Sequence, residues 1–116
     1  MVETPNVLLF SYGTLQLERV QWESFGRLLD GEDDDVMLGY RQAMIEITDP
    51  QVICQSGQKF HPIVTPTNNP KDEVPGKVFR LTESELAAAD RYEVADYKRV
   101  LVILKSGKEA WVYIRK

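Results

Sequence analysis

The architecture expected of this chain starts from the segment Val7-Leu8-Leu9-Phe10-Ser11-Tyr12-Gly13-Thr14-Leu15. Its first part is a short apolar run rich in strand-forming residues, and the run stops at a glycine. This pattern predicts a buried strand that ends in a tight loop before a helix. Glycine in such a loop lets consecutive backbone N–H groups point into one concavity, which suits a carboxylate or a developing oxyanion. An ordinary strand-to-helix turn explains the same pattern, so the segment alone leaves both interpretations open.

The rest of the chain predicts alternating short strands and helices. Apolar residues at helical spacing predict a helix over residues 16–29, and the acidic run at 30–35 is expected to form a solvated loop. Residues 51–62 favour no single structure. Strands are expected at residues 36–47, 63–65, 76–81, 97–105 and 109–115, with a bend at Gly39 and a hairpin turn at 106–108.

The clearest helix start lies at Thr82, where Glu85 follows at the spacing of a capping box. The alanine-rich stretch after it predicts a helix over residues 83–91. Strands with helices between them predict one α+β domain over residues 1–116, with a mixed sheet that can curl into a partly closed barrel.

Composition excludes several classes of partner. The chain has 116 residues, a net charge of −4 and no long basic run, which disfavours nucleic-acid binding and an anionic membrane surface. The single cysteine, Cys54, cannot form an internal disulfide, and the N-terminus lacks a basic, apolar leader. We therefore expect a cytosolic protein that is a monomer or a homodimer.

The reactive side chains of the sequence limit the kinds of catalytic site that the chain can form. His61 is the only histidine, and we expect it in a surface or half-buried loop because no nucleophile elbow accompanies it. One histidine and one cysteine cannot build a standard zinc site, and the acidic residues 32–35 lack the spacing of a calcium loop. No phosphate-binding glycine motif is present. Carboxylate chemistry with backbone N–H groups remains, and it needs no metal or organic cofactor.

Glu93 is the candidate carboxylate, because it stands at the end of the predicted helix and before the next strand. The negative end of the helix dipole disfavours its ionisation, and Tyr92, Val94 and Tyr97 can desolvate it. Both effects raise a glutamate pKa towards the range that a general base needs near neutrality. A surface glutamate in a connecting loop is the alternative, and Glu46 in a predicted strand is a competing carboxylate.

Together, these features resemble the γ-glutamylcyclotransferase-like family. Tyr12-Gly13-Thr14-Leu15 looks like its Tyr-Gly-Ser/Thr-Leu signature after an apolar first strand. Residues 75–81 resemble its Gly-x-Val-aromatic-x-Leu strand, residues 86–93 its helix-ending Leu-Asp-x-x-Glu segment, and residues 97–102 its Tyr-x-Arg-x-x-Val continuation. Residues 111–113 look like its closing strand, so the resemblance covers nearly the whole chain.

The resemblance implies a small mixed-strand β-barrel flanked by helices. It also implies a cofactor-independent enzyme that releases 5-oxoproline from γ-glutamyl compounds. Glu93 matches the family's acid/base. Tyr12, Gly13, Thr14 and Leu15 match the groups that hold the glutamyl moiety, and Tyr97 is a further substrate-binding candidate.

Two departures from the family pattern leave the substrate open. Val94 follows Glu93 where the family often has glycine, and Ala89 precedes Asp90 where leucine is common. A non-catalytic small-molecule binding or interaction domain of the same fold is therefore the alternative function. A different acyl or amine transfer that uses Glu93 is a third hypothesis.

Overall fold

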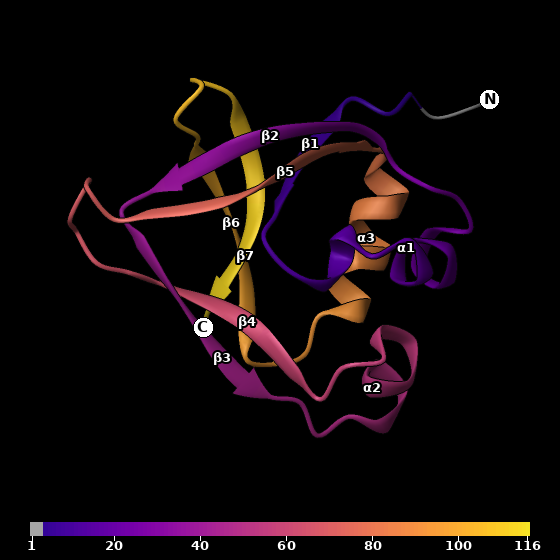
Figure 1. Ribbon diagram of the computed structural model, residues 1–116. Helices are drawn as coiled ribbons and strands as arrows, with labels where there is room; N and C mark the ends of the chain where they lie inside the picture. Colours follow the sequence, from indigo (N-terminus) through magenta and orange to yellow (C-terminus); the bar gives the residue numbers. More distant parts are fainter. Residues whose placement is uncertain (1–3) are drawn as a thin grey trace.

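The computed structural model describes residues 4–116, and Figure 1 shows strands on one side of the molecule and three helices gathered on the other. The helices are α1 (Glu18–Phe25), α2 (Pro50–Ser56) and α3 (Glu83–Tyr92), and a 3₁₀ turn, η1 (Thr14–Gln16), precedes the first. The strands are β1 (Val7–Ser11), β2 (Asp30–Leu38), β3 (Tyr40–Glu46), β4 (Phe60–Pro66), β5 (Glu73–Leu81), β6 (Tyr97–Ile103) and β7 (Glu109–Arg115).

Five strands form a mixed sheet in the order β2-β5-β1-β7-β6, while β3 and β4 form a separate pair. Strand β1 runs antiparallel to β5 and parallel to β7, so the expected α+β class and mixed sheet are confirmed. The sheet curls, so that its two edge strands, β2 and β6, approach each other. Lys105, which follows β6, donates its amide hydrogen to the Val36 carbonyl of β2 at 2.8 Å. Within the described residues no strand pair joins the two sheets, so the barrel is open.

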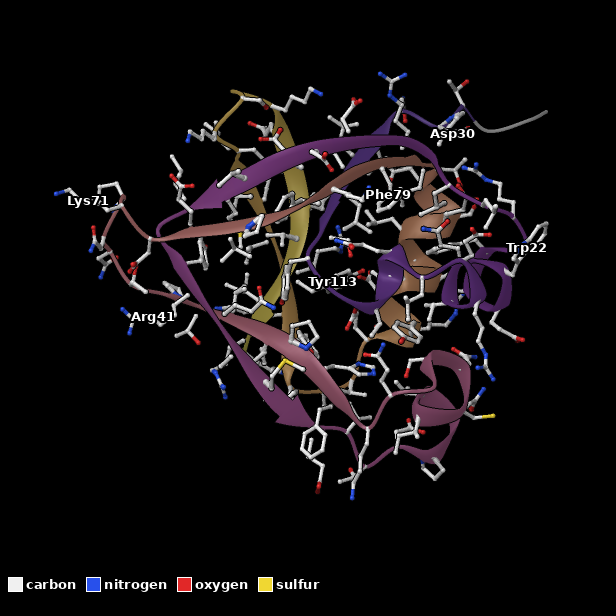
Figure 2. The ribbon with its side chains drawn as sticks, in the orientation of Figure 1. Trp22, Asp30, Arg41, Lys71, Phe79 and Tyr113 are labelled. Carbon is white, nitrogen blue, oxygen red and sulfur yellow. The ribbon has the colours of Figure 1, made fainter. Side chains whose placement is uncertain are left out.

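The central strand is buried on both faces, as its continuous apolar run predicts. Leu9 belongs to a core cluster that packs against residues of α1 and α3, whereas the adjacent Phe10 belongs to a second cluster on the opposite face. Val64 of β4 lies in that second cluster, so the β3–β4 pair covers the face that the helices leave free. Figure 2 shows Phe79 in the interior and Trp22 at the periphery.

The helix that begins after Thr82 forms as expected. The Thr82 side chain accepts from the Glu85 amide at 3.1 Å, and the Glu85 carboxylate accepts from the Thr82 amide at 2.9 Å. Arg27 also binds the Glu85 carboxylate through two nitrogens, at 2.6 and 2.8 Å. These contacts define where α3 begins, and the pocket described below lies at the other end of this helix.

The prediction of a solvated loop at residues 30–35 is wrong, because these residues form the first part of β2. Asp34 pairs across the sheet with Lys77 at 3.7 Å, and Lys108 in the β6–β7 turn reaches Asp33 at 3.3 Å. Asp35 is buried and accepts hydrogen bonds from the Ser106 hydroxyl and amide. Partners distant in sequence thus offset the low strand propensity of aspartate.

Candidate active site

The loop after β1 approaches β4 closely at Gly13. Gly13 has an extended backbone conformation, with φ −138° and ψ −144°, so it is not required for a left-handed turn. A Cβ atom at this position would lie 3.0 Å from Cγ of Pro62. Glycine therefore suits this position, because a side chain would press against the Pro62 ring of β4.

The same loop leaves backbone donors free. In the 3₁₀ turn the amides of Gln16 and Leu17 donate to the carbonyls of Gly13 and Thr14, at 3.1 and 3.0 Å. Among the hydrogen bonds of residues 4–116, the amides of Thr14 and Leu15 have no acceptor, as expected of the first residues of a helical turn. These two N–H groups can bind an anionic group of a ligand.

Glu93 is the C-cap residue of α3, and its amide donates to the Ala89 carbonyl at 3.1 Å. Burial, and to a smaller extent the negative charge of Asp90, raise the pKa of its carboxyl group to about 8. The free acid is thus the main form at pH 7, and the ionised form becomes accessible just above neutrality.

One pocket gathers the loop and the carboxylate. It is lined by Phe10, Ser11, Tyr12, Gly13, Thr14, Leu15, His61, Pro62, Glu93, Tyr97 and Tyr113. All six of the predicted site residues are in this set. Figure 2 places Tyr113 in the interior, between the sheet and α3. The cavity volume is about 20 Å³, which is room for about one ordered water molecule.

Two tyrosine hydroxyls of the pocket donate to backbone carbonyls, and the Tyr97 hydroxyl links the five-stranded sheet to the β3–β4 pair. Tyr12 donates to the Tyr113 carbonyl of β7 at 2.6 Å, and Tyr97 donates to the Pro62 carbonyl of β4 at 2.7 Å. Burial is the main reason that the pKa of both hydroxyls is raised. Tyr97 therefore lines the pocket with a hydroxyl hydrogen that is already committed to β4.

Asp90 supports the pocket from outside. Its Oδ1 accepts from the Tyr113 hydroxyl at 2.7 Å and from Arg99 Nε at 2.8 Å, while Oδ2 accepts from Arg99 Nη2 at 3.1 Å. Arg99 in turn lies 4.4 Å from the ring centroid of Trp111. This network fixes the Tyr113 ring, and it holds a negative charge one helical turn before Glu93.

The sequence matches the family described as gamma-glutamyl cyclotransferase, AIG2-like, over residues 9–116. The chain belongs to this family. No curated protein matches it.

Solved structures share the fold of this cyclotransferase-family chain at low identity. An uncharacterized protein from Homo sapiens has a TM-score of 0.73 at 18% identity, over 97% of this chain and 68% of the other. An Arabidopsis thaliana protein has a TM-score of 0.69 at 20% identity, with coverages of 99% and 66%. A protein named gamma-glutamyl cyclotransferase has a TM-score of 0.67 at 18% identity, with coverages of 95% and 66%. The chain thus spans about two thirds of the length of each.

The competing carboxylates of this family member lie elsewhere. Glu46 is exposed at the end of β3, where it pairs with Lys59 at 3.4 Å. Asp96 is exposed, and neither residue belongs to the pocket lining. Glu93 is the one carboxylate among the described lining residues.

Sequence reasoning missed five of the described lining residues, and His61 is the one among them with an imidazole ring. It lies within β4 and is 3% exposed, so the expectation of a surface or half-buried loop is wrong. The alternation of His61 with Ile63, also fully buried, is the signal that could have placed it on an inward face. Pro62, between them, covers the Gly13 loop.

Residues 4–116 contain no group of three or more histidine, cysteine, aspartate or glutamate side chains placed to share a metal ion. Within the same residues, every helix is too short or too polar to cross a bilayer.

Proposed function

We propose that this chain catalyses intramolecular aminolysis of a γ-glutamyl amine or peptide and releases 5-oxoproline. The observation that carries the proposal is the shared pocket, in which Glu93 and the residues Tyr12 to Leu15 face one small volume. Membership of the cyclotransferase family supports the same reaction class.

In the proposed reaction the substrate's α-amino nitrogen attacks its own γ-carbonyl carbon. A C–N bond forms and closes the lactam, and the C–N bond to the leaving amine breaks. Both reacting atoms belong to one molecule, so the pocket needs to hold a folded conformer with them about 3–3.5 Å apart. In this proposal the free amides of Thr14 and Leu15 bind the α-carboxylate or the developing oxyanion, which is supported by their place in the pocket lining.

Glu93 is the proposed proton carrier. The α-amino group arrives as an ammonium ion with three hydrogens, of which the lactam nitrogen keeps one. Glu93 accepts one proton before attack and donates it to the leaving nitrogen as the C–N bond breaks. The second proton passes from the ring nitrogen through Glu93 to the released amine, which departs as an ammonium ion and leaves Glu93 ionised. A carboxyl group with a pKa of about 8 is suited to both steps, because its two forms are close in free energy near neutrality. The positive charge of a bound ammonium ion lowers that pKa and favours the ionised form.

The small cavity favours a second candidate, a non-catalytic binding domain that keeps the pocket but not turnover. A volume of about 20 Å³ does not hold a γ-glutamyl group unless side chains move on binding. Turnover therefore requires that the pocket widens, and side-chain rearrangement on ligand binding is common.

The test is incubation of the protein with a panel of γ-glutamyl amines, γ-glutamyl dipeptides and glutathione, followed by detection of 5-oxoproline. We expect release from at least one member of the panel. Glu93→Gln should reduce that rate by about 10² or more while substrate still binds. Binding without release of 5-oxoproline by the unmodified protein would favour the non-catalytic candidate.

A further inference from the structure

His61 is a buried polar residue that the proposed reaction does not use. It is the only histidine of the chain, it is 3% exposed, and it lines the same pocket as Glu93. It comes from β4, and the next residue of that strand, Pro62, lies against Gly13. Both ring nitrogens of a buried imidazole are expected to have hydrogen-bond partners, in the protein or in a ligand.

One ring nitrogen is fixed by the end of α2. His61 Nε2 lies 3.0 Å from the hydroxyl oxygen of Ser56, which is itself buried. The Ser56 hydroxyl donates to the Gln58 carbonyl at 3.1 Å and accepts from the Gln58 amide at 3.2 Å. The two Gln58 contacts and the His61 contact form together only when the hydroxyl hydrogen points to the Gln58 carbonyl, and the hydroxyl then accepts from the ring. We therefore assign the ring hydrogen to Nε2, which leaves Nδ1 as an acceptor.

The charges around His61 favour a cationic ligand group. Burial lowers the pKa of His61, although a hydrogen bond with the Gln58 backbone opposes this, so the imidazole is neutral at pH 7. Tyr12, Tyr97 and Tyr113 line the pocket as neutral phenols, because burial raises the pKa of each. The described lining contains no lysine or arginine. Glu93 is the one carboxylic acid of this lining. An ammonium ion in the pocket therefore meets no positively charged side chain of the lining.

We propose that His61 is a second substrate-contacting residue, whose Nδ1 accepts a hydrogen bond from the α-ammonium group of the γ-glutamyl moiety. This inference rests on the proposed function. The neutral imidazole and the Glu93 carboxylate then hold the ammonium between them, while the Thr14 and Leu15 amides bind the carboxylate end. His61 thus orients the nitrogen whose proton Glu93 removes, and it selects ligands that carry a free α-amino group.

The single histidine makes imidazole ¹⁵N NMR of the unmodified protein a direct test. The free protein should show the tautomer with hydrogen on Nε2. Saturation with L-glutamate should shift the Nδ1 resonance, because Nδ1 then accepts a hydrogen bond. Glutarate, which lacks only the α-amino group, should bind about tenfold more weakly or worse and leave Nδ1 unchanged. A protonated Nδ1 in the free protein, or no Nδ1 shift with L-glutamate, would overturn the inference.

Two substitutions give an independent kinetic test. In His61→Asn the amide oxygen can take the place of Nδ1, whereas His61→Gln places its amide near Nε2 and Ser56. With a γ-glutamyl compound that the unmodified protein turns over, His61→Gln should raise KM by about tenfold or more and change kcat little. His61→Asn should raise KM less.

The outcomes separate this inference from the proposed function. Equal effects of the two variants, or a loss in kcat with unchanged KM, would show that His61 is not a binding contact. The proposed reaction would still be supported by turnover of the unmodified protein. Absence of 5-oxoproline release by the unmodified protein would instead remove the proposed reaction, and the L-glutamate and glutarate titrations would still decide the role of His61. Thermal unfolding of both variants checks that the buried position tolerates the change.

Discussion

Glu93→Gln is expected to stabilise the protein as the pH rises. The folded state raises the carboxyl pKa from 4.5 to about 8, so folding favours the protonated form. The contribution of the protonated Glu93 carboxyl group to the free energy of unfolding is therefore present in full below pH 4.5. It is lost as the pH rises from there through about 8. Glutamine resembles the neutral acid in shape and has no proton to lose, so the variant avoids this loss.

The magnitude follows from the difference between the two pKa values. At 1.36 kcal/mol per unit, the variant should exceed the unmodified protein in free energy of unfolding by about 2 kcal/mol at pH 6 and about 3 kcal/mol at pH 7. These are upper limits, because Glu93 is half-buried and water in the pocket screens its charge. At pH 4 the two proteins should be equally stable.

Urea unfolding between pH 4 and pH 8 measures this difference. Glu109→Gln, which changes an exposed carboxylate on β7, is the matched control and should show no such trend. A constant difference between Glu93→Gln and the unmodified protein across this range would refute the argument, because it would mean that burial does not perturb Glu93. The same perturbation predicts that kcat/KM of an active protein rises with pH towards about 8.

Three further predictions concern the loop, the sheet and the chemistry. Gly13→Ala places Cβ 3.0 Å from Cγ of Pro62, so it should lower the free energy of unfolding by about 1 kcal/mol but reduce 5-oxoproline release tenfold or more; an activity loss explained by the unfolded fraction alone would contradict this. Gly76→Ala places Cβ 2.5 Å from the Ser11 carbonyl oxygen, and calorimetry should show a loss of about 3 kcal/mol or more because backbone cannot move aside. Turnover should survive a chelator and alkylation of the exposed Cys54, since no proposed step uses a metal or a thiol; inactivation by EDTA that a divalent metal reverses would overturn the mechanism.

Local signals in the sequence predicted the elements that hold the site. The capping box at Thr82 and Glu85 placed the start of α3, and with it the position of Glu93 at the helix end. The apolar run of β1 and the glycine after it placed the loop that lines the pocket. These predictions succeeded because helix capping, strand alternation and chain breaks depend on residues within a few positions of one another.

Other predictions failed where the partners are distant in sequence. The acidic residues of β2 looked like a loop because the lysines that pair with them, and the serine that donates a hydrogen bond to Asp35, come some 40 to 75 positions later. Residues 51–62 gave no prediction, yet they form all but the first residue of α2 and the start of β4.

The sequence alone was enough to predict the α+β class, the mixed sheet and the carboxylate at the end of α3, because each depends on local propensity and on the alternation of apolar residues. Only the tertiary structure placed His61 in the pocket. That placement depends on the β3–β4 pair folding over the Gly13 loop, where the Tyr97 hydroxyl of β6 joins β4 from 35 positions further along the chain. The cavity is small for the same reason: its walls come from separate parts of the chain, and only their packing sets the distance between them.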